Sequence, residues 1–240
     1  PGETMRQHCD LSPSSAHRWM ACPGSVQLSR NVIEIPSDYA REGTAAHALA
    51  EACLRDGGAQ HYVDCISETR KLSPSTTIEV LVPDFRGRLE KALDVMATGL
   101  PDVMNHNLET VERLQRPVRK TARYDRSFWV LKHAKSRGFI TKTGLMLGIG
   151  EKKEEIAQLL KDIAAANVDI ITIGQYLSPS KEHAPIDRWV HPDEFAEWKK
   201  FALDLGIKHV ESGPLVRSSY KADEQVVKFN LLERRKTHSA

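Results

Sequence analysis

The sequence predicts an α/β fold in which strands and helices alternate along most of the chain. From about residue 55 onward, short β-branched or apolar runs alternate with segments whose apolar residues recur at helical spacing. Glycine and proline stand at several of the boundaries between these segments. Residues 168–173 are almost entirely apolar, which is typical of a strand buried on both faces in a parallel sheet covered by helices.

The first elements of this pattern are short. A helix is expected over residues 59–71, and the β-branched run 76–82 is expected to form a strand that ends at Pro83. A further short strand is expected around residues 103–105. Apolar residues at helical spacing predict a helix between these two strands: Leu89, Ala92, Leu93 and Met96.

The later elements follow the same alternation. A helix over residues 127–134 is expected to stop at Gly138, before a strand at 140–147. Another helix is expected over residues 156–163, before the apolar strand at 168–173.

A last helix is expected over residues 192–205, because Pro192 and Asp193 favour a helix start and Gly206 favours its end. The pattern therefore holds about four strand–helix units. With right-handed crossovers, such units close into either a barrel or an open doubly wound sheet. In both folds the active-site groups gather where strands end and helices begin.

Composition narrows the class of protein. The chain has 240 residues, of which 40% are hydrophobic and 28% charged, as in a globular protein with one large domain or two small ones. Its net charge of +2 favours neither nucleic acid nor a membrane surface as a partner. No apolar run reaches the about 18 to 20 residues of a membrane span, and residues 1–10 lack the apolar core of a secretory signal. We therefore expect a cytoplasmic protein.

The pattern divides the chain into three parts. Short helices without a strand are expected in residues 1–54. Because the pattern changes near Leu54, we expect a domain boundary there. Residues 55–225 hold the strand–helix units. Residues 226–240 form a tail whose apolar residues only hint at an amphipathic segment: Val227, Leu231 and Leu232.

The cysteines do not form a binding motif. Cys9, Cys22, Cys53 and Cys65 are spaced unlike a zinc knuckle, a redox pair or a disulfide framework. Isolated cysteines in a reducing compartment are mostly buried as small hydrophobic residues. We expect this of Cys53 and Cys65, because Cys65 shares a helical face with apolar neighbours.

Six sequence blocks resemble the lipoyl synthases. In order they read DGGAQH (56–61), IEVLVPDFRG (78–87), NHNLET (105–110), TKTGLMLGIGE (141–151), GQYL (174–177) and GPLVRSSY (213–220). Residues 55–225 thereby resemble the carboxy-terminal two-thirds of that family. The resemblance implies a partial radical S-adenosylmethionine (βα) barrel, preceded here by a small helical segment.

The same resemblance implies a sulfurtransferase with two 4Fe–4S clusters and S-adenosylmethionine. One cluster, held by a Cys-x3-Cys-x2-Cys triplet, cleaves S-adenosylmethionine, and an auxiliary cluster donates sulfur to carbons 6 and 8 of an octanoyl chain on a lipoyl carrier domain. In the family, both triplets precede the matching part. Cys9, Cys22 and Cys53 lack this spacing, and the first two barrel strands are missing too. We therefore expect an exposed sheet edge and a chain that alone binds neither the two clusters nor S-adenosylmethionine and is inactive.

The resemblance also assigns residues to the cofactor site. Gly144, Met146, Gly148 and Glu151 lie on a strand and turn that would line the S-adenosylmethionine site, where small residues let a ligand approach the backbone. Three polar residues at the end of the 103–105 strand and just after it would orient a polar ligand: Asn105, Asn107 and Glu109. His106, which lies between them, favours a structural role.

Four further residues are assigned by resemblance. Gln175 and Tyr176 would line the same cavity, although a core tyrosine with a bonded hydroxyl is the alternative for Tyr176. Ser218, or Ser219 as the alternative, would be an oxygen ligand of the auxiliary cluster. Without partner cysteines, a hydrogen-bonded loop is the simpler interpretation of these serines.

A basic segment is a candidate for partner binding. Arg116, Arg119 and Arg123 are expected on one loop that could meet acidic lipoyl domains, and a solvated loop is the alternative.

Residues 8–54 resemble the start of phage-associated RecB-like nucleases through two blocks, 12–23 and 41–51, where Gly43, His47 and Glu51 fit a Gly-x3-His-x3-Glu helix. His47 and Glu51 could touch one divalent metal, or form a surface pair. The alternatives to a lipoyl synthase-like protein are thus a fragment of a metal-dependent nuclease and a non-catalytic product of a gene fusion or misassembled reading frame.

Overall fold

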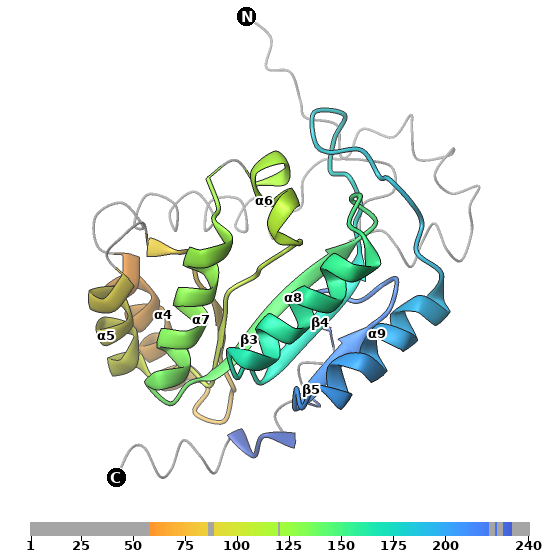
Figure 1. The fold of residues 1–240 in the computed structure, drawn as a ribbon. Coiled ribbons are helices and arrows are strands. Elements are labelled where there is room, and N and C mark those ends of the chain that lie inside the picture. Colours follow the sequence, from red (N-terminus) through yellow and green to blue (C-terminus); the bar gives the residue numbers. More distant parts are fainter. Residues whose placement is uncertain (1–57, 86–88, 120, 221–223, 225–227, 232–240) are drawn as a thin grey trace, which may run out of the picture.

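The computed structural model describes residues 58–231, except for residues 86–88, 120, 221–223 and 225–227 (Figure 1). The helices expected in residues 1–54, the buried Cys53 and the pair His47 and Glu51 lie outside the described residues. None of the helices in the described part is long and apolar enough to cross a membrane.

The described residues form one parallel sheet of five strands whose spatial order follows the chain. The strands are β1 (Glu79–Leu81), β2 (Val103–Asn105), β3 (Ile140–Leu147), β4 (Ile170–Gln175) and β5 (His209–Ser212). The α/β class is confirmed, and four of these strands were predicted. The fifth was missed because its four residues, His-Val-Glu-Ser, have no apolar run and no strong alternation.

Six helices lie in the described part, and all but α6 were predicted. They are α4 (Gly58–Leu72), α5 (Leu89–Gly99), α6 (Glu112–Val118), α7 (Tyr124–Ser136), α8 (Lys153–Ala165) and α9 (Pro192–Asp204). Pro117 lies inside α6, which is why the sequence favoured a loop there. As predicted, Gly138 and Gly206 follow the ends of α7 and α9, with φ of 84° and 92°.

The strand order decides between the two predicted architectures. Successive strands are neighbours throughout, so right-handed crossovers place every connecting helix on the same face of the sheet. Figure 1 shows α7, α8 and α9 side by side on that face. A doubly wound sheet would reverse direction at a switch point, and these strands do not. The sheet is therefore an arc of a singly wound barrel.

The two faces of the sheet differ in chemistry. Leu145, Leu147, Ile171 and Ile173 face the helices and pack in the main core with residues of α8 and α9. Because side chains alternate along a strand, their neighbours point to the opposite face, which we call the inner face. It carries Glu79, Asn105, Lys142, Gly144, Thr172 and Gly174.

The tail closes the amino-terminal end of the inner face. Leu231, which is 3% exposed, packs with the first inner-face residues of three strands, Val103, Ile140 and Ile170, and Phe229 lies against the same cluster. The hint of an apolar face in the tail is therefore confirmed for Leu231. Val227 and Leu232 lie outside the described residues.

The prediction for Cys65 was wrong, because the side chain is exposed. The face of α4 that packs on α5 carries Val63 and Ile66, both of which approach Gly99. Residue 65 points about 100° away from residue 66 around the helix. Its sulfur lies 3.6 Å from Nε2 of His61 instead.

Candidate functional site

The end of β2 carries the first predicted site residues. Asn105 is 1% exposed, and its amide nitrogen donates a hydrogen bond of 2.8 Å to Glu79 on β1. Glu79 also accepts one of 2.7 Å from Lys142 on β3. Among the described residues, the amide oxygen of Asn105 is buried without a hydrogen-bond partner. Three adjacent strands thus build one polar cluster on the inner face.

Asn107 repeats this arrangement two residues later. Its amide oxygen, like that of Asn105, is buried without a hydrogen-bond partner in the described part. A Cβ atom on Gly144 would lie 2.9 Å from this oxygen and 3.2 Å from the hydroxyl of Thr172. Glycine at position 144 therefore lets Asn107 lie close to β3.

Glu109 is fixed to β3 by its backbone. Its N–H donates to the carbonyl of Gly144 (2.9 Å), and its carbonyl accepts from the N–H of Met146 (2.8 Å), with φ at 66°. Met146 is half-buried. Burial raises the pKa of the Glu109 carboxyl, an effect that Arg119 and Asn107 partly offset. The structure thus brings Asn105, Asn107, Glu109, Gly144 and Met146 together.

His106 points to the opposite face, as its structural interpretation requires. Its ring nitrogens lie 2.8 Å from the carbonyl of Val82 and 3.0 Å from the hydroxyl of Ser127. Burial lowers the pKa of His106 below the usual histidine value. Both ring nitrogens have protein partners, so His106 anchors α7 to the sheet.

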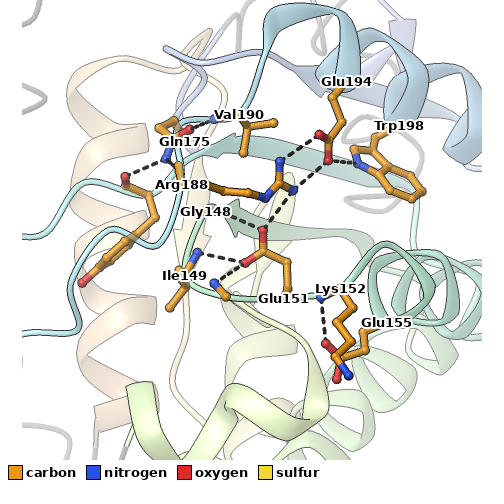
Figure 2. A network of polar contacts seen from close by, with 12 residues as sticks. Gly148, Ile149, Glu151, Lys152, Glu155, Gln175, Arg188, Val190, Glu194 and Trp198 are labelled. Atoms are coloured by element: carbon orange, nitrogen blue, oxygen red, sulfur yellow. Dashed lines mark hydrogen bonds and ion pairs between the residues drawn. The ribbon is translucent and has the colours of Figure 1, made fainter.

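The turn after β3 places Glu151 in a cap. Its carboxylate accepts hydrogen bonds from the backbone N–H groups of Gly148 (2.7 Å), Ile149 (2.9 Å) and Gly150 (3.1 Å) (Figure 2). The side chain is 1% exposed. Glu151 therefore holds the turn by its carboxylate, and a direct contact with a cofactor stays a prediction for this residue.

Gln175, at the end of β4, clamps the loop that follows it. Its side-chain oxygen accepts from the N–H of Val190 (2.9 Å), and its nitrogen donates to the carbonyls of Arg188 (3.2 Å) and Tyr176 (3.1 Å) (Figure 2). A Cβ on Gly148 would lie 2.4 Å from this nitrogen and 2.4 Å from the Arg188 carbonyl. The Gln175 side chain is thus engaged within the protein.

Tyr176 has the contacts expected of a core tyrosine with a bonded hydroxyl, which was the alternative to a place in the cofactor cavity. It is 5% exposed, and its hydroxyl donates 2.8 Å to the carbonyl of Ala184. Together with Gln175 it holds the loop 177–190 against the ends of β3 and β4. A role of both residues in lining a cofactor cavity stays a prediction.

The two candidate serines lie on the loop after β5. Ser218 is half-buried and Ser219 is exposed. Just before them, the carbonyl of Val216 would lie 2.2 Å from a Cβ on Gly174, so this loop rests directly on the inner face of β4. Burial lowers the pKa of Arg217, whose guanidinium lies at the same place. The serines are therefore near the predicted site, and their ligand role stays a prediction.

The predicted basic loop is not one loop. Arg116 is exposed on α6, Arg119 donates to the carbonyl of Asn107 (3.0 Å), and Arg123 pairs with Asp125 (3.2 Å) at the start of α7. Arg119 therefore stabilises the Asn107 segment. Arg116 and Arg123 are both exposed and stay candidates for contact with an acidic partner.

The cluster ligands of the expected chemistry do not fit the described residues. Cys65 is the cysteine in that part of the chain, and it is exposed on α4. No group of three or more His, Cys, Asp or Glu side chains in the described part could hold a metal. Iron–sulfur clusters of this class require thiolates at close spacing, so these residues do not supply either cluster site.

Curated relatives decide the family question. Lipoyl synthase from Pseudoalteromonas atlantica is 57% identical over 202 residues, which cover 83% of this chain and 62% of the relative. Lipoyl synthase from Cupriavidus necator is 56% identical over 205 residues, which cover 85% of this chain and 60% of the relative. The chain is homologous to the lipoyl synthases. The resemblance predicted from the six blocks is confirmed, and the chain spans between 60% and 62% of the length of these relatives.

Two other comparisons add less. A family model described as "Protein of unknown function (DUF2800)" matches residues 8–115, so it gives the nuclease alternative no support. A domain of pyruvate-formate lyase-activating enzyme from Bacteroides vulgatus covers 64% of this chain and 94% of that domain, with 9% identity and a TM-score of 0.48. The barrel arc therefore rests on the strand order rather than on that likeness. The domain boundary near Leu54 stays a prediction.

Sequence reasoning missed residues that shape this candidate site. Glu79 and Lys142 fall inside matching blocks but were read only as parts of strands. A charged residue at an inner position of a buried strand was the available signal, because such residues are rarely buried without a partner. Arg188 was missed as well, since it lies in a loop without a recognisable motif.

Proposed function

We propose that this chain carries the cofactor-facing half of a lipoyl synthase-type radical S-adenosylmethionine barrel, and that it inserts no sulfur on its own. The observation that carries the proposal is the group of hydrogen-bond acceptors on the inner face, at the carboxyl ends of β2 and β3. Ligand sites of parallel α/β folds lie at this edge of the sheet.

S-adenosylmethionine fits this acceptor group. The cofactor carries an ammonium group and ribose hydroxyls, all of them hydrogen-bond donors, and its sulfonium bears a positive charge. Asn105 and Asn107 offer two amide oxygens that have no partner among the described residues, and Glu109 adds a carboxyl group. Gly144, which has no side chain, lets the Asn107 amide oxygen lie against β3 beside the hydroxyl of Thr172. When bound and reduced, S-adenosylmethionine supplies a carbon radical.

The clusters do not fit, and we therefore derive no sulfur insertion by this chain. The reactive centre needs thiolates at close intervals, which the sequence does not contain. The substrate of the proposed type of reaction is an octanoylated lipoyl carrier domain. It would approach at the carboxyl ends of the strands, where Gln175, Tyr176, Gly148 and Glu151 hold the turn and loop rigid.

Anaerobic reconstitution of the intact chain with iron and sulfide tests this proposal. We expect no stoichiometric iron or sulfide, no cleavage of S-adenosylmethionine, and no lipoyl product from an octanoylated carrier domain by mass spectrometry. The lipoyl synthase from Pseudoalteromonas atlantica, treated in parallel, serves as the positive control. Two clusters per chain together with lipoyl formation would overturn the proposal.

A further inference from the structure

Two asparagines on the inner face share one arrangement. Asn105 donates its amide N–H to Glu79, and Asn107 lies beside the Glu109 carboxyl group, whose pKa it lowers. In each case the amide oxygen is buried and has no partner among the described residues. A buried acceptor without a partner costs on the order of 1 to 3 kcal/mol, so such groups are rare in folded proteins. Two of them, two residues apart, indicate a ligand that donates hydrogen bonds.

The neighbouring carboxylate determines which end of the Asn105 amide faces the ligand. An ionised carboxylate can only accept hydrogen bonds, so the neighbouring asparagine must turn its NH2 group towards it. The amide oxygen then points away from the carboxylate. For Asn105, Glu79 therefore determines that the free position presents an acceptor rather than a donor.

Lys142 in turn fixes Glu79. Its ammonium nitrogen lies 2.7 Å from one oxygen of Glu79, while the other oxygen accepts from Asn105 at 2.8 Å. The Lys142 side chain is 0% exposed and that of Glu79 is 25% exposed. Buried ion pairs contribute little net stability compared with apolar residues of the same volume. Their presence on the ligand-facing side of a sheet is better explained by orientation of a third group.

We infer that Glu79, held by Lys142, is a positioning residue that fixes the Asn105 amide so that its oxygen accepts a hydrogen bond from a hydroxyl or ammonium group of the ligand. This inference rests on the proposed function, in which the ligand is S-adenosylmethionine. Glu79 acts only through Asn105. The pair therefore selects donors over acceptors at this position of the inner face.

Titration of S-adenosylmethionine into the intact chain by calorimetry tests the inference. In Glu79→Gln, the introduced amide can turn either its NH2 group or its oxygen towards Asn105. The Asn105 amide is then no longer held in one orientation. We expect affinity to fall about tenfold, the value of one hydrogen bond. Glu90→Gln, at an exposed position of α5, is the matched control and should bind like the unmodified chain.

The double variant Glu79→Gln with Asn105→Asp separates positioning from general damage. The introduced glutamine can donate to the introduced aspartate, whose second oxygen again presents an acceptor to the ligand. We expect affinity within about threefold of the unmodified chain, because one donor–acceptor pair has exchanged places. A merely structural role for Glu79 predicts that two changes in a buried cluster weaken binding more than one.

The outcomes are distinguishable. Unchanged affinity in folded Glu79→Gln, or no recovery in the double variant, overturns the positioning role but leaves the proposed function standing. No binding by the unmodified chain overturns both. If Glu79→Gln does not fold, two pairs of ligands are compared for binding to the unmodified chain. Adenosine is compared with 2′,3′-dideoxyadenosine, which lacks the ribose hydroxyls. Methionine is compared with N-acetylmethionine, which lacks the ammonium group. Equal binding within both pairs would contradict the requirement for a donor.

Discussion

Arg188 and Glu194 form a two-pronged ion pair in which each terminal guanidinium nitrogen lies 2.8 Å from one carboxylate oxygen (Figure 2). The pair joins the loop 177–190 to the first turn of α9. One of these nitrogens also lies 3.6 Å from Glu151, which caps the turn after β3. Hydrogen bonds from Arg188 lower the pKa of the Glu194 carboxyl. Arg188 thus connects two segments at the carboxyl edge of the sheet.

Replacement of Arg188 by Lys should loosen the loop without unfolding the chain. A lysine cannot form two parallel hydrogen bonds with one carboxylate, and we expect a loss of about 1 to 2 kcal/mol in local stability. Hydrogen exchange of the Asp187 and Val190 amides, which donate to Gly148 and Gln175, measures this loss. Arg137→Lys, whose partner Asp94 is 66% exposed, should leave those two amides unchanged.

Gly148 requires glycine for two reasons. Its φ is 97°, and an added Cβ would lie 2.4 Å from both the Arg188 carbonyl and the Gln175 side chain. Gly148→Ala should therefore lower the free energy of unfolding by about 3 kcal/mol or more. Gly138 is the matched control, since its φ is 84° but nothing lies within 4 Å of an added Cβ. Gly138→Ala should cost only about 1 kcal/mol in the same urea titration. Equal losses would contradict the close approach at Gly148.

Asp169 should contribute stability that depends on pH. The carboxylate is fully buried and bonded to Lys135, Lys208 and Thr141. Burial raises its pKa, but these partners outweigh burial and the pKa lies below the usual value. The stabilisation is therefore present above the unfolded-state pKa of about 4 and is lost as pH falls through the folded-state value.

The variant Asp169→Asn isolates this contribution. It should unfold with a free energy lower by on the order of 2 kcal/mol at pH 7, and the difference from the unmodified chain should shrink below about pH 4. Urea titrations across this range provide the measurement. A difference that stays constant with pH would show that the carboxylate charge contributes nothing.

Glu155 offers a direct check of the charges around α8. Hydrogen bonds from Arg113 and from the backbone of Lys152 lower the pKa of Glu155 to about 2. A carboxyl-detected NMR titration should show this value in the unmodified chain. In Arg113→Ala the pKa should rise towards the usual glutamate value, and no rise would refute the pairing with Arg113.

Much of the fold could be predicted because its elements have strong periodicity. The helix over 153–165 has apolar residues at regular helical spacing, the strand over 140–147 is marked by Gly138 before it and by an apolar end, and both lie where predicted. The strand predicted at 168–173 is found at Ile170–Gln175. It begins later than predicted because Asp169, just before its first residue, bonds through its carboxylate to Thr141 and to two lysines. Propensity alone does not report such tertiary contacts.

The site was less predictable than the fold. Neighbouring residues of one motif separate to opposite faces, as Asn105 and His106 do, and this follows from strand alternation once the register is known. Glu151 and Gln175 were assigned to a ligand, yet the structure engages both with backbone groups. Which polar side chains are satisfied within the protein depends on partners distant in sequence, such as Arg188.

We propose that the inner face beside Asn105 and Asn107 binds S-adenosylmethionine. The most direct test is a titration of the cofactor into the intact, isotopically labelled chain, followed by NMR of the side-chain amides of these two asparagines. If the cofactor binds there, both amides should show saturable shifts, and the amide of Gln158 on the exposed side of α8 should be unaffected. Unchanged Asn105 and Asn107 signals at saturating cofactor would contradict it.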